Sequence, residues 1–246
     1  MRHGAVGTET VMKTTLAGAL AVLILLGQAA GAQDRQGPVV VELFTSQGCS
    51  SCPPADALLG ELAMREDVIA LALHVDYWDY IGWEDTFAMP EMTQRQHGYA
   101  YAAGSTVVYT PQIIIGGQDH VVGVRPMAVA DLIQAHASAP DPVSVSLIRD
   151  AGGLALRAEA HMDPPRPQMV VQVVTFSPHE EMAIERGERA GTTAHHYNVV
   201  TSWQVVAEWD GANPFAARIE PQSDLPLVVI VQQRDHGPIL GAARLD

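Results

Sequence analysis

The stretch that most constrains the fold is residues 39–56, with the sequence VVVELFTSQGCSSCPPAD. An apolar run of strand type ends in a short polar loop, which is followed by Cys49, two serines and Cys52. Two prolines come next, where a helix can begin because its first residues need no hydrogen-bonded N–H group. The chain has only these two cysteines, so any thiol chemistry of one involves the other. A strand that leads into C-x-x-C at the start of a helix is typical of a redox centre.

The pattern after the cysteines predicts a βαβ unit. Apolar residues recur at helical spacing to about Met64, and residues 68–75 form a near-continuous apolar run, typical of a strand buried on both faces. A strand, a helix and a strand at this spacing place the two strands parallel in one sheet. The sequence then predicts a helix, a hairpin with Gly-Gly at its turn and an amphipathic helix, at 89–102, 112–122 and 126–137.

A change of pattern near residue 140 predicts a second domain. Residues 138–142, Ser-Ala-Pro-Asp-Pro, have the composition of a linker. Beyond them, short apolar runs separated by Pro, Gly and Asp turns predict β-strands without a helix between them. We therefore expect an α/β domain over 37–139 and a smaller β-rich domain, sandwich-like, over 143–246.

The N-terminus has the pattern of a secretory signal peptide. Residues 12–13, Met-Lys, open a short positive region, and the apolar run over 16–26 is too short to span a bilayer. Residues 30–32, Ala-Gly-Ala, supply a small-x-small cleavage site, so the predicted signal peptide covers 1–32, with Met12 as an alternative start. Cleavage there predicts a periplasmic or secreted protein without a stable membrane span, and an uncleaved anchor is the alternative.

The net charge of the chain and its predicted export limit the classes of function that the protein can have. Lys and Arg number 14 against 28 Asp and Glu, a formal net charge of −14, so no basic surface is expected for a nucleic-acid partner. The sequence contains neither a Gly-rich phosphate loop nor a G-x-S-x-G hydrolase motif, and no cofactor is predicted. In an oxidising compartment, however, a structural disulfide is as ordinary as a catalytic one.

The cysteine pair is the candidate reaction centre. Two cysteines three residues apart at a helix start face the same way and can come within disulfide distance. Cys49 is expected nearer the positive helix end, which favours the thiolate, so we assign it the attacking role and Cys52 the resolving role. The alternative is an inert bridge, although so small a loop removes little entropy from the unfolded chain. Exchange with a protein thiol or disulfide, and with an unidentified redox partner, is the preferred function.

With Thr110-Pro111, these features resemble the thioredoxin superfamily, and the whole mature chain is similar to an uncharacterised family of secreted, thioredoxin-like bacterial proteins. The resemblance is carried by ELFTSQGCSSCPPAD, HVDYWDYIGW, YTPQIIIG and ERGERAGTTAHHYNVV, at 42–56, 74–83, 109–116 and 185–200. It implies a thioredoxin-like first domain, with a central mixed sheet flanked by helices. It also implies that Pro111 is cis and faces the cysteines, and that the backbone of Thr110 receives the substrate chain. A trans proline that merely begins a strand is the alternative.

Glu42 interrupts the first apolar strand seven residues before Cys49. The resemblance implies a buried carboxylate close to this place, behind the second cysteine. Buried there, its pKa would be raised and it could exchange a proton with Cys52. Glu42 lies one residue further from the cysteines than that pattern requires. A solvent-facing or salt-bridged glutamate on an edge strand is the alternative.

Aromatic residues follow the second predicted strand, at the sheet edge where ligands bind in parallel sheets. Tyr77 and Trp78 are candidate substrate-binding residues, whereas Trp83 is expected to pack an inserted helix against the sheet. Packing alone is the alternative for Tyr77 and Trp78 as well.

A metal site is not predicted. The adjacent His195 and His196 would point to opposite faces of a strand and could not easily share an ion. One alternative remains, in which Cys49, Cys52 and His74 bind a soft ion such as Cu(I). The competing class of function is therefore a non-enzymatic binding protein, either such a copper carrier or a scaffold with a structural disulfide.

Overall fold

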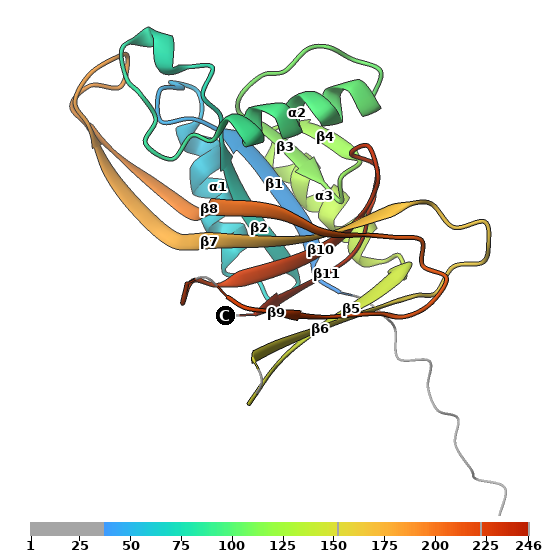
Figure 1. Ribbon diagram of the computed structural model, residues 1–246. Helices are drawn as coiled ribbons and strands as arrows, with labels where there is room; N and C mark the ends of the chain where they lie inside the picture. The colour runs from blue at the N-terminus through green and yellow to red at the C-terminus, as the bar shows by residue number, and fades with distance from the viewer. Residues whose placement is uncertain (1–36, 152, 222, 246) are drawn as a thin grey trace, which may run out of the picture. The chain divides into compact units, whose positions relative to one another are not determined.

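In a computed structural model, residues 37–151, 153–221 and 223–245 are described, and the predicted signal peptide with its two possible starts lies outside them. Three α-helices, a 3₁₀ turn and eleven strands follow one another in the described chain (Figure 1). Their bounds are β1 Val39–Thr45, α1 Pro53–Ala63, β2 Val68–His74, η1 Asp79–Ile81, α2 Pro90–Ala102, β3 Gln112–Ile115, β4 Asp119–Val122, α3 Pro126–Ala137, β5 Val143–Asp150, β6 Gly153–Ala160, β7 Met169–Ile184, β8 Thr192–Trp209, β9 Phe215–Ile219, β10 Leu227–Gln233 and β11 Ile239–Leu245.

The elements around the cysteines agree closely with the sequence pattern. Each of the three α-helices has proline in its first turn, where the missing N–H group costs no hydrogen bond. The predicted hairpin is formed by β3 and β4, and both Gly116 and Gly117 at its turn have positive φ, a conformation that glycine adopts without strain. None of the helices in the described chain is long and apolar enough to cross a membrane.

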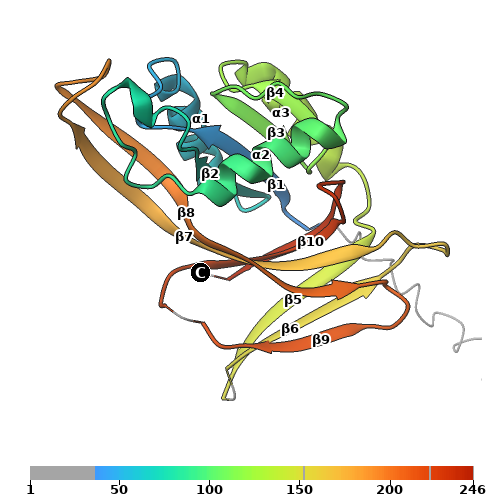
Figure 2. The same ribbon diagram turned by 45° about the horizontal axis from the view of Figure 1, so that its top comes forward.

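The main sheet has eight strands in the order β11-β10-β7-β8-β2-β1-β3-β4. It is mixed, because β1 pairs parallel with β2 and antiparallel with β3, and β2 pairs parallel with β8 at Ala72 and Val199. The remaining strands, β5, β6 and β9, form a second, three-stranded sheet. The class is therefore α/β, with helices on the larger sheet and a separate all-β layer, as Figure 2 shows.

The larger sheet continues across the predicted domain boundary. Strands β7, β8, β10 and β11 all come after residue 142, yet they extend the sheet that β1 to β4 form. The apolar residues of β5 and β6 pack on β7 and β10 in one cluster, which joins the second sheet to the first. The boundary at 139–143 thus separates two patterns of secondary structure that share a sheet, and a division into independent domains there stays a prediction.

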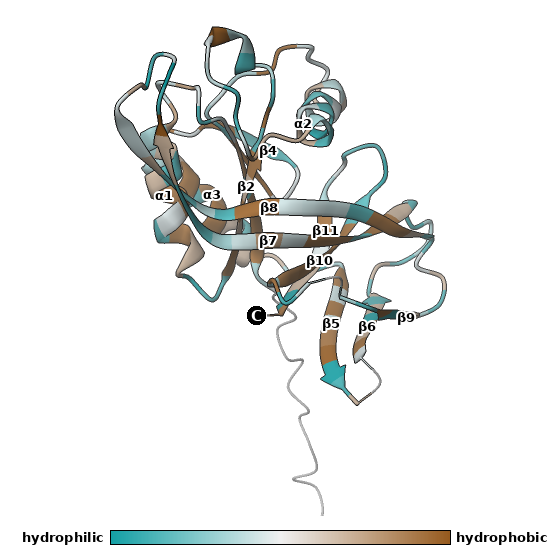
Figure 3. Ribbon diagram, turned by 60° about the vertical axis from the view of Figure 1, so that its left-hand side comes forward, coloured by the Kyte–Doolittle hydropathy of each residue, from teal (hydrophilic) through white to brown (hydrophobic). Residues whose placement is uncertain are grey.

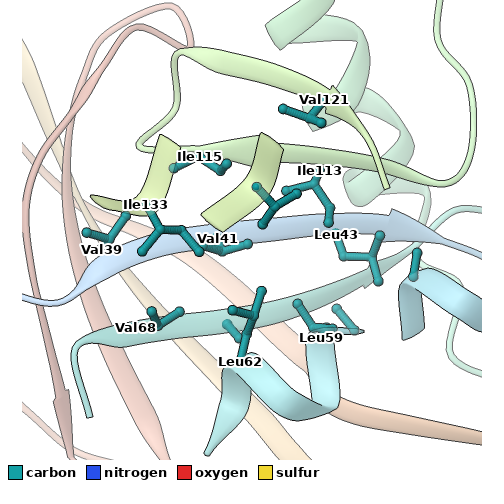
Figure 4. Packing of buried hydrophobic residues seen from close by; sticks show 14 of the residues in the cluster. Val39, Val41, Leu43, Leu59, Leu62, Val68, Ile113, Ile115, Val121 and Ile133 are labelled. Atoms are coloured by element: carbon teal, nitrogen blue, oxygen red, sulfur yellow. The ribbon is translucent and has the colours of Figure 1, made fainter. Parts of the chain in front are cut away.

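Both faces of the central strands are buried. Because side chains alternate along a strand, Val39, Val41 and Leu43 face α1 and α3 (Figure 4). Val40 and Phe44 lie on the opposite face, with residues of α2. Every residue of β1 and β2 is buried, as the near-continuous apolar run of β2 predicted. Each large apolar side chain removed from water in this way contributes about 1.5–3 kcal/mol. The alternation also decides on which side of the sheet each polar residue of β1 lies.

Strands β7 and β8 form a hairpin that extends beyond the rest of the sheet toward the loop after β1 (Figure 1). Hydrophobic and hydrophilic residues are mixed along this hairpin, whereas β10 and β11 are more uniformly hydrophobic (Figure 3). Near its tip, Ile184 and Ala194 pack on Trp83, which comes from the segment between β2 and α2. The hairpin therefore brings residues from the second half of the chain to the cysteine loop.

Candidate functional site

Cys49 and Cys52 lie between the end of β1 and the start of α1, with their sulfur atoms 2.08 Å apart at disulfide-bond distance. Cys52 is the N-cap of α1, and its carbonyl oxygen accepts hydrogen bonds from the N–H groups of Ala55 and Asp56 at 2.8 and 3.0 Å. Cys49 lies one turn earlier, in a turn closed by its own N–H group and the carbonyl of Ser46. The expectation that Cys49 is nearer the helix N-terminus is therefore wrong, because the helix begins only at Pro53.

The two cysteines are covered although the loop between them is not. Cys49 is 1 % exposed and Cys52 0 %, while Ser50 and Ser51 face solvent. A Cβ atom added at Gly48 would lie 3.4 Å from Ile81 and 3.5 Å from Trp78, so the segment after β2 lies directly on the cysteine loop. Exchange at either sulfur requires this cover to move.

Gln47 holds the segment after β2, which covers the cysteine loop, through several hydrogen bonds. Its N–H group donates to Asp85 at 2.7 Å, and its side chain contacts Thr86 and accepts a hydrogen bond from the Trp83 indole at 2.8 Å. Its carbonyl oxygen accepts from Arg189 of the β7–β8 hairpin tip at 3.0 Å. Two segments distant in sequence therefore hold the residue that lies two positions before Cys49. Trp83 packs on the hairpin here, rather than holding α2 against the sheet.

Thr110 and Pro111 lie next to this site, and the peptide bond between them is cis. A Cβ atom added at Gly123 would lie 2.9 Å from Ala55 of α1 and 3.0 Å from Pro111, which places the proline beside the first turn of the helix. The indole N–H of Trp78 donates to the Thr110 hydroxyl at 2.7 Å. The structure thus brings Thr110, Pro111 and Trp78 together beside the cysteine loop.

Tyr77 is turned toward α2. Its hydroxyl donates to Gln96 at 3.2 Å, and its ring lies 6.2 Å from that of Trp78. Burial raises the pKa of Tyr77 to about 12, against the opposing hydrogen bonds of Gln96 and Thr110. The phenol is therefore neutral, and it can offer a hydrogen bond or a contact surface but no charge.

Glu42 faces away from the cysteines. It shares the α2 face of β1 with Val40 and Phe44, whereas α1 packs on the opposite face. Its carboxylate is fully buried, accepts hydrogen bonds from Arg95 at 2.7 and 3.2 Å, and is also bonded to the Tyr99 hydroxyl. This placement is inconsistent with a direct proton relay to Cys52. The salt-bridged alternative describes Glu42 better, but on an interior strand rather than an edge.

The buried carboxylate on the cysteine side is Asp56, which sequence reasoning missed. It is 4 % exposed and accepts a hydrogen bond from the Thr45 hydroxyl at 2.7 Å. The signal that could have found it is its spacing from Cys52, because residues four apart lie on the same face of a helix.

Asp56 belongs to a group of buried polar residues that we call the histidine cluster. Its members are Thr45, Asp56, His74, Asp85 and His196. Nδ1 of His74 lies 2.7 Å from Asp85, the rings of His74 and His196 are 4.5 Å apart between centroids, and Nδ1 of His196 lies 3.8 Å from Asp56. The neighbouring His195 is half exposed, so the prediction that His195 and His196 point to opposite faces is confirmed.

Burial and ion pairing determine which side chains of the histidine cluster are charged. Burial by itself would raise the pKa of Asp85, but the charge and hydrogen bond of His74 outweigh it and hold that pKa below its ordinary value. For His196, burial dominates and lowers the pKa, which Asp56 only partly offsets. Asp85 is therefore a carboxylate and His196 a neutral imidazole at neutral pH.

Across the described ranges, no three or more His, Cys, Asp or Glu residues are arranged to hold a metal ion. The alternative set of Cys49, Cys52 and His74 thus gains no support. A cavity of about 220 Å³ opens beside the cysteine loop, lined among others by Pro53, Asp56 and Arg189. A larger one, of about 560 Å³, lies at the opposite end of β1 and β2.

Residues 40–232 match the family described as protein of unknown function, DUF1223. The chain belongs to this family. Among solved structures, this DUF1223 protein is similar to a protein from Agrobacterium tumefaciens whose crystal structure comes from the Northeast Structural Genomics Consortium. The two share 33% sequence identity with a TM-score of 0.72, over 84% of this chain and 93% of the other. No curated protein matches the chain. The function must therefore be argued from the site.

Proposed function

We propose that this DUF1223 protein is an exported thiol–disulfide oxidoreductase that acts on protein thiols or disulfides through Cys49 and Cys52. The observation that carries the proposal is the place of the disulfide, between the end of a central strand and the N-cap of the helix packed on that strand. Unpaired N–H groups and the helix dipole at such a position stabilise a thiolate. A bond intended only to stabilise the fold gains little from closing so short a loop.

The arrangement around the cysteines supports a thioredoxin-like first segment. Parallel β1 and β2 flank α1 in sequence, antiparallel β3 and β4 complete that side of the sheet, and α3 packs on the same face as α1. Pro111 lies beside the first turn of α1, which supports its proposed place in the site. Thr110, Trp78 and Tyr77 then form the proposed contact surface for an extended substrate chain.

The two cysteines have different roles in the proposed exchange. Cys49 lies in the loop outside the helix, so its sulfur can reach a substrate once the cover moves, whereas Cys52 is fixed at the N-cap. The Cys49 thiolate attacks a substrate disulfide, which forms a mixed disulfide and releases one substrate sulfur as a thiolate. Cys52 then attacks the Cys49 sulfur, so that the Cys49–Cys52 bond forms and the second substrate sulfur leaves.

A second candidate function is a scaffold or binding protein whose disulfide is structural. The burial of both cysteines, at 1 % and 0 % exposure, favours it, because a permanently covered disulfide is protected from exchange. The two candidate functions differ in whether Cys49 forms a disulfide with a sulfur atom of another protein.

Trapping separates these candidates. The variant Cys52→Ser removes the resolving sulfur, so mixed disulfides should accumulate on Cys49 in the compartment where the protein resides. The matched control is Cys49→Ser, which keeps one thiol but lacks the attacking one. Adducts on the first variant and few on the second support exchange. If neither variant carries an adduct, the scaffold is the better description.

A further inference from the structure

We propose that His196 is the proton acceptor of the cysteine centre: when the disulfide is reduced, the proton of the Cys52 thiol passes into the histidine cluster and is held on His196. This inference rests on the proposed thiol–disulfide function and deepens it. It identifies the group that allows the resolving cysteine to react as a thiolate, a role for which the sequence suggested Glu42.

The histidine cluster lies under the first turn of α1. Asp56, four residues after Cys52, donates its backbone N–H to the Cys52 carbonyl at 3.0 Å and turns its carboxylate into the cluster. Nδ1 of His196 lies 3.8 Å from that carboxylate, too far for a hydrogen bond but within the range of an ion pair. A proton on His196 would therefore meet a negative partner that is already in place.

The nitrogen atoms of the two histidines are incompletely satisfied. Both ring nitrogens of His196, and Nε2 of His74, are buried and have no hydrogen-bond partner among the described residues. A buried polar atom without a partner destabilises the folded protein, so a group of three calls for an explanation beyond packing. Because a carboxylate can only accept, Nδ1 of His74 must carry a proton toward Asp85.

Burial outweighs the acidic groups that face His196, so proton uptake needs additional negative charge nearby. The titratable ones are Asp56 from α1, His74 from β2 and Asp85 from the segment after β2, and the Phe87 ring packs against it at 6.0 Å. Burial lowers the pKa of His196 in the disulfide form, so the imidazole is free to accept. Cys52 is the N-cap of the helix whose first turn carries Asp56, and residues four apart lie on one face of a helix. A thiolate on Cys52 therefore adds negative charge on the side of Asp56, which favours the imidazolium.

Reduction of the protein by a dithiol transfers two electrons and releases two protons. The Cys49–Cys52 bond breaks and receives two electrons, while the dithiol is oxidised to a disulfide and releases two protons. One proton stays on the Cys49 sulfur or goes to solvent, and the other is held on His196 beside the Cys52 thiolate. In the reverse direction the Cys52 thiolate attacks Cys49, and His196 returns its proton to the substrate sulfur that leaves, through solvent.

The first test compares the histidine titrations of the wild-type protein in its oxidised and reduced forms by nuclear magnetic resonance. The pKa of His196 should be higher in the reduced form, whereas that of the exposed His195 should be the same in both. The variants His196→Gln and His195→Gln assign the two signals. An equal pKa of His196 in the two forms would overturn the proposal, and this comparison needs no variant to fold.

The second test measures the ionisation of Cys52 directly. In the Cys49→Ser variant Cys52 is the only thiol, so the ultraviolet absorbance of the thiolate reports it alone. Adding His196→Gln should lower the thiolate fraction at neutral pH by about tenfold, the effect of one nearby charge. Adding His195→Gln should leave it unchanged. Equal fractions in all three proteins would refute the role of His196.

The two proposals can fail separately. If Cys52→Ser traps no adducts, thiol exchange itself is wrong, whatever His196 does. If adducts form but neither the His196 titration nor the Cys52 ionisation responds, only the proton-acceptor role is wrong.

Discussion

Two buried polar groups lie on opposite faces of β1, and they differ in how completely their atoms are paired. On the α2 face, Glu42 is bonded to Arg95 and Tyr99, and Arg95 also reaches Gln172 and Gln232. The guanidinium further stacks 3.9 Å from the Trp203 ring. On the α1 face, three buried nitrogen atoms of the histidine cluster have no partner among the residues that the structure describes.

The difference indicates different roles for the two groups. A fully paired network in a low-dielectric interior stabilises one arrangement of its members, and it links α2 to strands from both halves of the chain. An incompletely paired group loses stability but keeps sites where a proton can be added. We therefore assign a structural role to the Glu42 network, and the chemical role that we propose belongs to the histidine cluster, although the sequence suggested Glu42 as the group that exchanges a proton with Cys52.

The largest expected effect comes from breaking the paired network. Arg95→Met should lower the free energy of unfolding by about 3–5 kcal/mol, because it leaves the Glu42 carboxylate buried without its cation. Denaturant unfolding measures the loss. Arg65→Met, which removes an exposed ion pair with Asp67, is the control and should cost less than about 1 kcal/mol.

The double variant Glu42→Leu with Arg95→Met makes this test sharper. Removing both charges together should recover much of the stability, because no unpaired charge is then buried. If Arg95→Met alone costs no more than Arg65→Met, the structural role of the network is wrong.

The next effect is on the pH dependence of stability. The pKa of His196 is lower in the folded protein than in the unfolded chain, so below the unfolded value, about 6.5, the unfolded state binds more protons. The stability that neutral His196 contributes is thus complete above about pH 6.5 and is lost as the pH falls toward its folded pKa. The contribution to the slope is at most about 1.4 kcal/mol per pH unit.

Variants isolate this contribution. His196→Gln should flatten the decline in unfolding free energy below about pH 6.5, while His195→Gln should keep the wild-type profile. His120 and His236 also have pKa values lowered mainly by burial, and they contribute equally to all three proteins. Identical slopes for wild type and His196→Gln would show that His196 is not held neutral by the fold.

The smallest effect on stability is expected from loosening the hydrogen bonds of Gln47, next to the buried cysteines. Arg189→Ala removes the hydrogen bond from the hairpin tip to the Gln47 carbonyl, at a cost of about 1 kcal/mol. The alkylation rate of Cys49 in the reduced protein should then rise several-fold, because the covered loop opens more often. Arg186→Ala alters an exposed arginine on the same tip and is the matched control. Equal alkylation rates would show that Arg189 does not fasten the cover.

The sequence pattern correctly predicted the elements whose structure depends mainly on residues close together in the chain. The strand before Cys49, the proline-led helices and the Gly116-Gly117 hairpin depend on neighbours in sequence, and all three occur as expected. Side chains alternate between the two faces of β1, so a shift of one residue would move Glu42 to the other face. The approximate spacing between Glu42 and the cysteines could not decide between these faces.

The histidine cluster could not be predicted in the same way. Asp56 and His196 are brought together only when β8 pairs with β2, through a single registered pair at Ala72 and Val199. The sequence after residue 142 was instead expected to form its own domain, because alternating strands do not reveal which sheet they join. The adjacent histidines were recognised as facing opposite ways, but the partners of the buried one lie far away in the chain.

The most direct test of the account is the reduction potential of the Cys49–Cys52 pair, measured by equilibration with glutathione or dithiothreitol buffers. A centre that exchanges electrons with protein substrates should have a potential well above about −300 mV. A value far below that would mean that the disulfide resists exchange and stabilises the fold, which would contradict the proposed function.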